Sequence, residues 1–144
     1  MQTYIGVKII EAEQGLSQKD IGDWPAGSDG YYVVYEDGYE SWIPKNMFEK
    51  AYRPVSVLTF GLAVEAMIIG KKVARSGWNG KGMWLFLVNS SEYQIDNHDV
   101  PLSIQYGQSN VLSPWIAMKT ADDKFVPWLA SQTDVLAEDY YILD

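Results

Sequence analysis

The chain has 144 residues, the size of one domain or of one domain with a sizeable extension. It contains no cysteine and a single histidine, which argues against a disulfide framework, a thiolate or histidine zinc site and a Ser-His triad. Its formal net charge of -8 argues against nonspecific binding to DNA or RNA, because that binding needs a basic surface. The longest apolar stretch, 55–69, is too short to span a bilayer and is interrupted by a glutamate. We therefore predict a soluble cytoplasmic protein with neither a nucleic-acid nor a membrane partner.

Aromatic residues make up 14% of the chain, with six tryptophans and ten tyrosines. Cores rarely use so many, whereas protein interfaces and ring-stacking pockets do. The hydrophobic fraction of 47% is sufficient for a packed core. The composition thus predicts a globular protein with an aromatic binding surface.

The chain divides near Pro54 into a β-rich N-terminal extension, residues 1–53, and an α+β domain, residues 54–144. Asp37-Gly38, between two tyrosine-rich runs, is a strong hairpin signal. The elements expected in the extension are a strand over 4–12, a loop over 13–30, a hairpin of 31–35 and 39–43, and a short helical turn over 44–50.

The domain over 54–144 begins with a helix for which Thr59 is a suitable N-cap and Gly70 a suitable C′ residue. We expect one main helix packed against a mostly antiparallel sheet, hence an α+β fold. The further expected elements are a strand over 73–75, a turn over 77–82, a buried strand over 83–88, a polar irregular stretch over 89–113, a hairpin of 114–120 and 124–127, a turn or short helix over 131–137, and a closing strand over 139–143.

The stretch 73–84 is the most informative part of the chain. It combines three glycines, two tryptophans, Arg75 and Lys81, and it contains no acidic residue. Glycine lets the backbone approach a ligand closely, tryptophan offers a flat face to a base, and cations suit phosphate. This pattern indicates a pocket for a small anionic aromatic molecule such as a nucleotide. A glycine-bearing turn between two strands, with its tryptophans in the core, explains the same residues, and both interpretations stay open.

Lys71 and Lys72 precede this stretch and extend its positive charge within an otherwise acidic chain. Cations at the end of a helix stabilise its C-terminus, and this accounts for these two lysines. Arg75 and Lys81 remain as ligand candidates.

Two sequence blocks carry a family resemblance that covers residues 57–144. The first is Trp78-Asn79-Gly80-Lys81-Gly82-Met83, and the second is S-Q-T-D-x-L-A-x-D over 131–139. Together they resemble a phage family, once a domain of unknown function, that includes the second type of Thoeris anti-defence protein. Two features depart from the pattern: compact members lack residues 1–53, and Tyr140 stands where tryptophan is common.

The resemblance implies a sponge rather than an enzyme. Such a protein binds the cyclised ADP-ribose signal made by a TIR-domain enzyme, leaves it intact, and so blocks Thoeris immunity in the cytoplasm of the infected bacterium. Glycocyclic ADP-ribose is the expected ligand, and some members also bind cyclic dinucleotides. The resemblance further implies a homo-oligomer, with a tetramer favoured and pockets near subunit contacts, and no cofactor or metal.

The ligand-binding candidates follow from the chemistry of such a nucleotide. Stacking on the base needs aromatic rings, the pyrophosphate needs cations and backbone N–H groups, and hydroxyls need amides or carboxylates. The candidates in these three roles are, respectively, Trp78, Trp84, Trp115 and Tyr106; Arg75, Gly80, Lys81 and Gly82; and Asn79, Gln132, Thr133 and Asp134. Each tryptophan could equally belong to the core, and Asp134 could equally cap the short helix.

Two other classes of function compete with the sponge. A phosphodiesterase or glycohydrolase would degrade the signal, but such enzymes use a histidine pair, a metal cluster or facing carboxylates. His98 stands alone in a polar stretch, and Asp122-Asp123 lies at an expected hairpin tip. The other competitor is a carbohydrate-binding or virion structural module, which would show no affinity for nucleotides. The role of residues 1–53 is left open.

Overall fold

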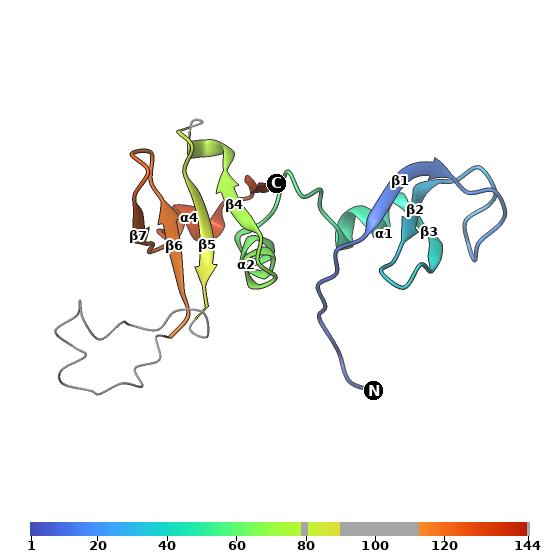
Figure 1. The fold of residues 1–144 in the computed structure, drawn as a ribbon. Helices are drawn as coiled ribbons and strands as arrows, with labels where there is room; N and C mark the ends of the chain where they lie inside the picture. Colours follow the sequence, from blue (N-terminus) through green and yellow to red (C-terminus); the bar gives the residue numbers. More distant parts are fainter. Residues whose placement is uncertain (79–80, 90–112, 144) are drawn as a thin grey trace. The chain divides into compact units, whose positions relative to one another are not determined.

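A computed structural model describes residues 1–78, 81–89 and 113–143. The chain forms two compact units, Met1–Pro54 and Val55–Asp144, called here the N-terminal unit and the C-terminal unit. Figure 1 shows the fold of each unit. Among the described residues, no helix combines the length and the hydropathy needed to cross a bilayer.

The N-terminal unit is a three-stranded antiparallel sheet with one short helix. The strands are β1 (Glu11–Leu16), β2 (Asp29–Val34) and β3 (Glu40–Pro44), in the order β1-β2-β3, and α1 (Lys45–Ala51) follows directly. The predicted hairpin and helical turn are confirmed. Gly38 has a φ of 80° in the turn between β2 and β3, a conformation that glycine adopts without steric cost.

The prediction for the start of this unit was wrong. Residues 4–10 lie outside any strand, and β1 begins only at Glu11, where its pairing with Val34 of β2 begins. The loop predicted over 13–30 was too long, because residues 13–16 belong to β1 and residues 29–30 belong to β2. The alternation of apolar residues identified a strand-like segment, but a strand exists only where a neighbour pairs with it.

Aromatic side chains pack on the sheet of the N-terminal unit. Val33 is fully buried, and Phe48 of α1 stacks on Tyr31 with ring centroids 4.0 Å apart. Trp42 is also buried and donates a hydrogen bond from Nε1 to the Gly15 carbonyl over 3.0 Å. A Cβ on Gly30 would fall against the Trp42 ring. Glycine at position 30 is therefore what lets this ring lie on the sheet.

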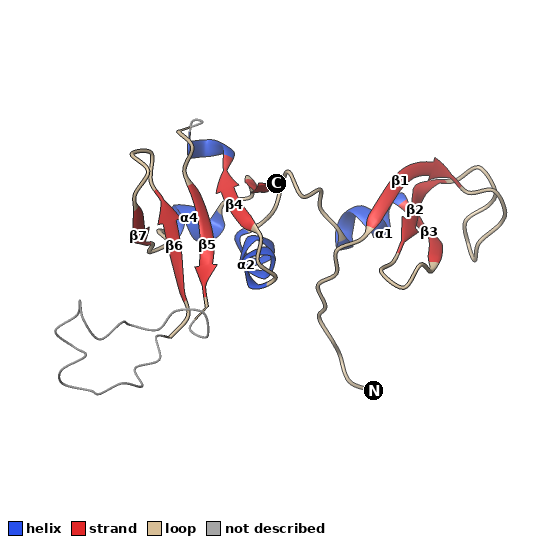
Figure 2. Cartoon of the chain, in the orientation of Figure 1, coloured by secondary structure: helices blue, strands red, loops and turns tan. Residues whose placement is uncertain are grey.

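The described part of the C-terminal unit comprises a five-stranded sheet and the α-helices α2 and α4. Figure 2 shows its strands and helices in different colours. Every paired strand is antiparallel to its neighbour, and the strand order is β7-β6-β5-β4-β8. The strands are β4 (Lys72–Arg75), β5 (Trp84–Val88), β6 (Trp115–Lys119), β7 (Phe125–Pro127) and β8 (Tyr140–Leu143). The α+β prediction is thus confirmed.

The helices of this unit begin and end as their sequences predict. In α2 (Phe60–Ile68), the Thr59 hydroxyl accepts a hydrogen bond from the Leu62 N–H over 3.3 Å. Gly70 follows the helix with a φ of 86°, as expected for a C′ glycine. The segment 131–137 contains α4 (Gln132–Leu136). A separate 3₁₀ turn, η1 (Ser76–Trp78), joins β4 to the glycine-rich stretch.

The two faces of the five-stranded sheet differ. One face, the inner face, packs against α2 and forms the core, in which Val73, Leu85 and Tyr140 are fully buried. On each strand, the residues next to these core residues point their side chains to the opposite face of the sheet. This second face carries no described helix, and we call it the open face.

Candidate functional site

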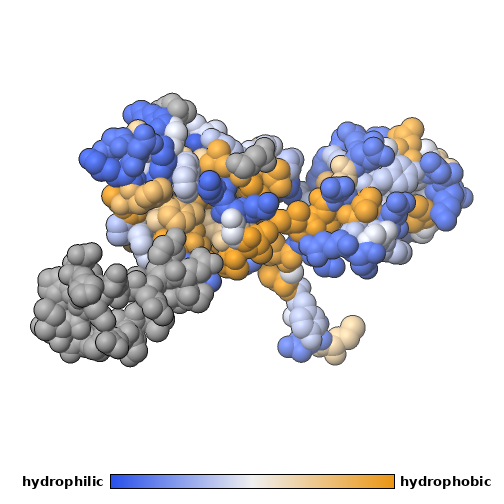
Figure 3. Space-filling model, in the orientation of Figure 1, coloured by the Kyte–Doolittle hydropathy of each residue, from blue (hydrophilic) through white to orange (hydrophobic). Residues whose placement is uncertain are grey.

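The open face is rich in aromatic side chains. Trp84, Phe86 and Phe125 form a cluster with ring centroids 5.4–5.9 Å apart. Tyr141 and Leu143 of β8 point to the same face, because their neighbours Tyr140 and Ile142 belong to the core on the inner face. Figure 3 shows hydrophobic residues gathered around the strands and hydrophilic residues at the turn between β6 and β7. The sheet thus presents flat rings on the face that no described helix covers.

A shallow hollow of about 150 Å³ lies where the glycine-rich stretch meets this face. Five of the predicted ligand-binding residues gather around it, together with three that were not predicted. The lining residues are Arg75, Trp78, Lys81, Gly82, Met83, Trp84, Tyr141 and Leu143. The structure therefore brings the first sequence block and the closing strand together.

A small residue separates the two aromatic walls of this hollow. Ala74 on β4 pairs with Tyr141 on β8, and Val73 pairs with Leu85, so Trp84 is the neighbour of Ala74 on the other side. Strands are about 4.8 Å apart, which places β5 and β8 about 9.5 Å from each other. Because Ala74 carries only a methyl group, its own side chain does not fill the space between Trp84 and Tyr141.

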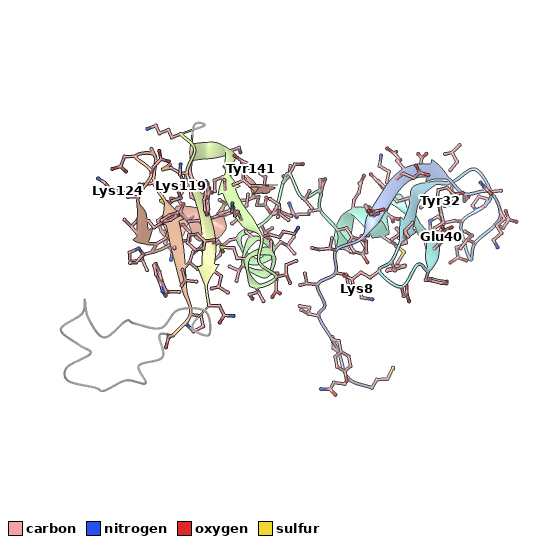
Figure 4. All side chains as sticks on the ribbon, viewed as in Figure 1. Lys8, Tyr32, Glu40, Lys119, Lys124 and Tyr141 are labelled. Atoms are coloured by element: carbon pink, nitrogen blue, oxygen red, sulfur yellow. The ribbon has the colours of Figure 1, made fainter. Side chains whose placement is uncertain are left out.

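Three lysines surround the hollow. Lys81 lines it directly, and the Lys72 ammonium lies 4.7 Å from the centre of the Trp84 ring. Lys119 donates a hydrogen bond to the Gly82 carbonyl over 3.3 Å and also pairs with Asp123. Figure 4 labels Lys119 on β6 and Tyr141 on β8. These cations give the hollow a positive border in a chain whose net charge is -8.

Arg75 is held by two carboxylates. Its Nε donates to Asp139 over 2.8 Å, and its Nη1 donates to Asp134 over 2.6 Å. Nη2 lies on the side of Gly77. Its charge is thus more than balanced by two acids, so Arg75 is a weaker partner for a pyrophosphate than its sequence context indicated. The neighbouring lysines suit that role better, and the predicted ligand contact of Arg75 stays untested.

This charged group shifts the pKa values of its members. Hydrogen bonding to Asp139 raises the pKa of Arg75, and the same bond lowers the pKa of Asp139. Partial burial disfavours ionisation of Asp134, but hydrogen bonds from Ser131 and Arg75 outweigh it and lower its pKa. Burial raises the pKa of Tyr140 to about 12. The two carboxylates are therefore held ionised and the phenol neutral.

Asp139 also fixes the turn that carries Trp78. Its Oδ2 accepts a hydrogen bond from the Gly77 N–H over 2.8 Å, and its carbonyl accepts one from the Ser76 N–H over 3.1 Å. Trp78 itself packs edge-on against Trp128 and against the core, and it lines the hollow as well. The two interpretations of Trp78, core and pocket, thus both describe part of its surroundings.

Asp134 caps α4. It completes a capping box with Ser131: each side chain accepts a hydrogen bond from the other residue's backbone N–H, over 3.0 and 3.1 Å. Tyr140 donates its hydroxyl hydrogen to the Asp134 carbonyl over 2.8 Å. The capping role left open by the sequence is thus present, and Asp134 is a structural link between α4, β4 and β8.

The other predicted residues that the structure describes, apart from Asp134, do not line the hollow. Gln132 and Thr133 are exposed on α4 and do not line it. Trp115 pairs with Val88 at the far end of β5, four residues or about 14 Å along the strand from Trp84. Asn79, Gly80 and Tyr106 lie outside the described residues. Ligand contacts from all six stay predictions.

Sequence reasoning missed Tyr141, Leu143, Met83, Lys72 and Lys119 as neighbours of the hollow. Met83 was expected within the buried strand over 83–88, and Lys72 at the end of a helix. The available signal was the alternation within 140–143 and 115–119, which places every second side chain on one face. Alternation alone does not say which strands are neighbours, so it could not place them together.

The part of the chain that contains this hollow matches a known protein family. Residues 58–143 match the family model of the Thoeris anti-defense 2-like domain, Tad2-like. The chain belongs to the Tad2-like family. It is also 43% identical over 89 residues to "Thoeris anti-defense 2" of Bacillus phage SP01, a match that covers 60% of this chain and 94% of that protein. The Tad2-like match includes the whole lining of the hollow and excludes the entire N-terminal unit.

Proposed function

We propose that this Tad2-like chain is a phage sponge that binds a TIR-derived cyclic ADP-ribose signal, glycocyclic ADP-ribose, and sequesters it without cleavage. In this way it blocks Thoeris immunity in the cytoplasm of the infected bacterium. The observation that carries the proposal is the hollow, in which Trp84 and Tyr141 stand beside Lys81. Aromatic faces next to cations are what a base linked to a pyrophosphate requires. The same hollow suits a cyclic dinucleotide as a second ligand.

Energetics favour a site that closes around the ligand. Nanomolar binding requires about -12.3 kcal/mol, and stacking contributes about 1–3 kcal/mol per base. Ligand pockets commonly enclose about 300–1,000 Å³, more than the hollow of about 150 Å³ in one copy. We therefore propose that a homo-oligomer, with a tetramer favoured, completes the pocket near a subunit contact. Trp115 and the exposed residues of α4 are available to contribute from a second copy.

The carboxylates near the hollow support binding over hydrolysis. A general acid or base works best with a pKa close to the working pH. Asp134 and Asp139 instead have lowered pKa values, because Arg75 and neighbouring donors hold them ionised. Their oxygens are already occupied by hydrogen bonds within the fold. Their geometry is that of structural acids.

Calorimetric titration with glycocyclic ADP-ribose, ADP-ribose and a cyclic dinucleotide tests the proposal. We expect tight binding of the cyclic ADP-ribose and recovery of its intact mass after the protein is denatured. A linear product would instead identify a phosphodiesterase or glycohydrolase. Absence of binding to all three nucleotides would overturn the proposal and favour a carbohydrate-binding or structural module.

Matched variants locate the site. Lys81→Ala should weaken binding of the cyclic ligand at least tenfold, because Lys81 lines the hollow. Lys124→Ala removes the same charge at the β6–β7 turn, where Lys124 pairs with Asp122 over 2.8 Å, and should leave affinity within twofold. Equal effects of the two substitutions would show that only net charge matters and that the hollow is not the site.

A further inference from the structure

The N-terminal segment exposes a row of apolar side chains before β1. Ile5 is 100% exposed, Val7 49% and Ile9 45%, and these β-branched residues alternate with Gly6 and Lys8. Such alternation is typical of a strand with one apolar face. Residues 4–10 nevertheless lie outside the strands of the unit. The segment therefore has the sequence of a strand without a partner among the described residues.

Its position explains why its own sheet does not pair with it. The first pair between β1 and β2 joins Glu11 to Val34, and the chain then turns back at Tyr35, whose N–H bonds to the Tyr39 carbonyl. Residues 4–10 thus run past the end of β2. Figure 4 shows Lys8 on the segment that leads into β1, and its ammonium lies 5.4 Å from the centre of the Tyr35 ring. The segment is continuous with β1 and available as an extension of it.

We propose that residues 4–10 pair with the same residues of a second copy as an antiparallel two-stranded ribbon. A twofold axis relates equal surfaces of two copies and makes such strands antiparallel. The register centred on Val7 places Ile5 opposite Ile9 and Val7 opposite Val7. Six β-branched side chains then share one face, and cross-strand pairs of this kind are the unit of sheet stabilisation.

Charge supports the same register. With Val7 on the axis, Lys8 lies opposite Gly6, and Glu11 lies opposite Thr3, so no like charges face each other. A register centred on Lys8 would place two ammonium groups opposite each other and Glu11 opposite Ile5. Like charges directly opposite are destabilising. A slip by one residue would place Val7 opposite Lys8 and mix the apolar and polar faces. The register centred on Val7 thus places every β-branched side chain of the row opposite another one without bringing like charges together.

This contact gives the N-terminal unit a role of its own. It joins two copies through residues that lie outside the Tad2-like match, which begins at residue 58. The ribbon continues into β1 on both sides, so it does not have to be stable as an isolated pair. The inference goes beyond the proposed ligand binding, which concerns the C-terminal unit, and it stands or fails independently of it.

Disulfide trapping in the full chain tests the register. The chain has no cysteine, so single substitutions report one position each. Paired residues on antiparallel strands have Cα atoms about 4.5–5.5 Å apart, within the range of a disulfide. Val7→Cys should therefore form a covalent dimer under mild oxidation. Ile5→Cys alone and Ile9→Cys alone should not, because the equivalent residues of the two copies would be about 14 Å apart.

A double variant and a charge variant complete the test. Ile5→Cys with Ile9→Cys in one chain should again cross-link, because position 5 faces position 9. Val7→Glu should reduce the assembly size measured by light scattering and leave the affinity for glycocyclic ADP-ribose unchanged. Cross-linking that is equal at all three single positions would indicate an unpaired tail. Absence of a Val7→Cys dimer would overturn the proposal, and so would an unchanged assembly size with Val7→Glu.

Discussion

The inner and open faces of the five-stranded sheet are built from neighbouring residues of the same strands. On β5, Leu85 is fully buried against the core on the inner face, whereas Trp84 lines the hollow on the open face. On β8, Tyr140 belongs to the core and Tyr141 lines the hollow. A change of one position therefore exchanges a residue that stabilises the fold for one available to a ligand. Stability and binding should separate between adjacent residues.

The largest expected effect is that of Leu85→Ala. Removing a fully buried leucine leaves a cavity, and such changes cost about 2–5 kcal/mol of the free energy of unfolding. Trp84→Ala, one residue away, should cost less stability because Trp84 is only half-buried and its ring contacts include the exposed Phe125 and Lys72. Denaturant unfolding of both variants measures the difference. If Trp84→Ala were the more destabilising, the assignment of faces would be wrong.

Replacement of Arg75 by methionine should have the next largest effect. It leaves Asp134 and Asp139 without their cation, and unsatisfied partly buried groups cost about 1–3 kcal/mol. The side chains of Arg75 and Asp139 are 14% and 30% exposed, so solvent reduces the cost relative to a fully buried pair. Adding Asp139→Asn to Arg75→Met should recover part of the loss. A fully additive second loss in the double variant would contradict this coupling.

Acid should weaken the ion pairs of Arg75 with Asp134 and Asp139. Asp134 and Asp139 have lowered pKa values in the folded protein. Their contribution to the free energy of unfolding is therefore fully present above the unfolded pKa of about 3.9, and it is lost as pH falls through the lower folded pKa values. We expect the free energy of unfolding to decrease below about pH 4. Asp139→Asn should flatten that decrease. An acid profile identical to that of the unsubstituted chain would show that Asp139 does not contribute to it.

Alkaline conditions act on the inner face through Tyr140. Its pKa is raised to about 12, so its contribution is complete below the unfolded pKa of about 10 and is lost as pH rises through 12. Tyr140→Phe should lose the hydrogen bond to the Asp134 carbonyl, which is worth about 1 kcal/mol at neutral pH, and should flatten the alkaline loss. Unfolding followed from pH 8 to about 12 compares the two proteins. Tyr141→Phe on the open face serves as the control and should keep the alkaline loss.

The smallest expected effect concerns the lysine above Trp84. Lys72→Ala removes a cation–π contact that is worth about 0.5–1 kcal/mol at an exposed site. The stability change should therefore stay below about 1 kcal/mol, while the affinity for an anionic ligand falls. Lys71→Ala, next to it in sequence and exposed, removes the same charge without that contact. Equal loss of affinity in both variants would show that the effect comes from the overall electrostatic field and not from the contact with Trp84.

Local sequence determined the helix ends and the hairpin turn, because these features depend on the residues that form them. Thr59 and Gly70 mark the ends of α2, and Asp37-Gly38 forms the turn between β2 and β3. Capping hydrogen bonds and positive φ values are local, so the residue types predict them directly. The start of β1 was not predictable in this way, because it depends on where β2 ends.

The candidate site depended on contacts between distant parts of the chain. The sequence showed the aromatic and cationic character of 73–84 and carried the family resemblance. It did not show that Arg75 bonds to Asp134 and Asp139, which lie 59 and 64 residues away. Nor did it show that Tyr141 stands opposite Trp84 across Ala74. Strand pairing decides such neighbours, and only the tertiary structure specifies it, because every antiparallel order of the same strands preserves the same alternation.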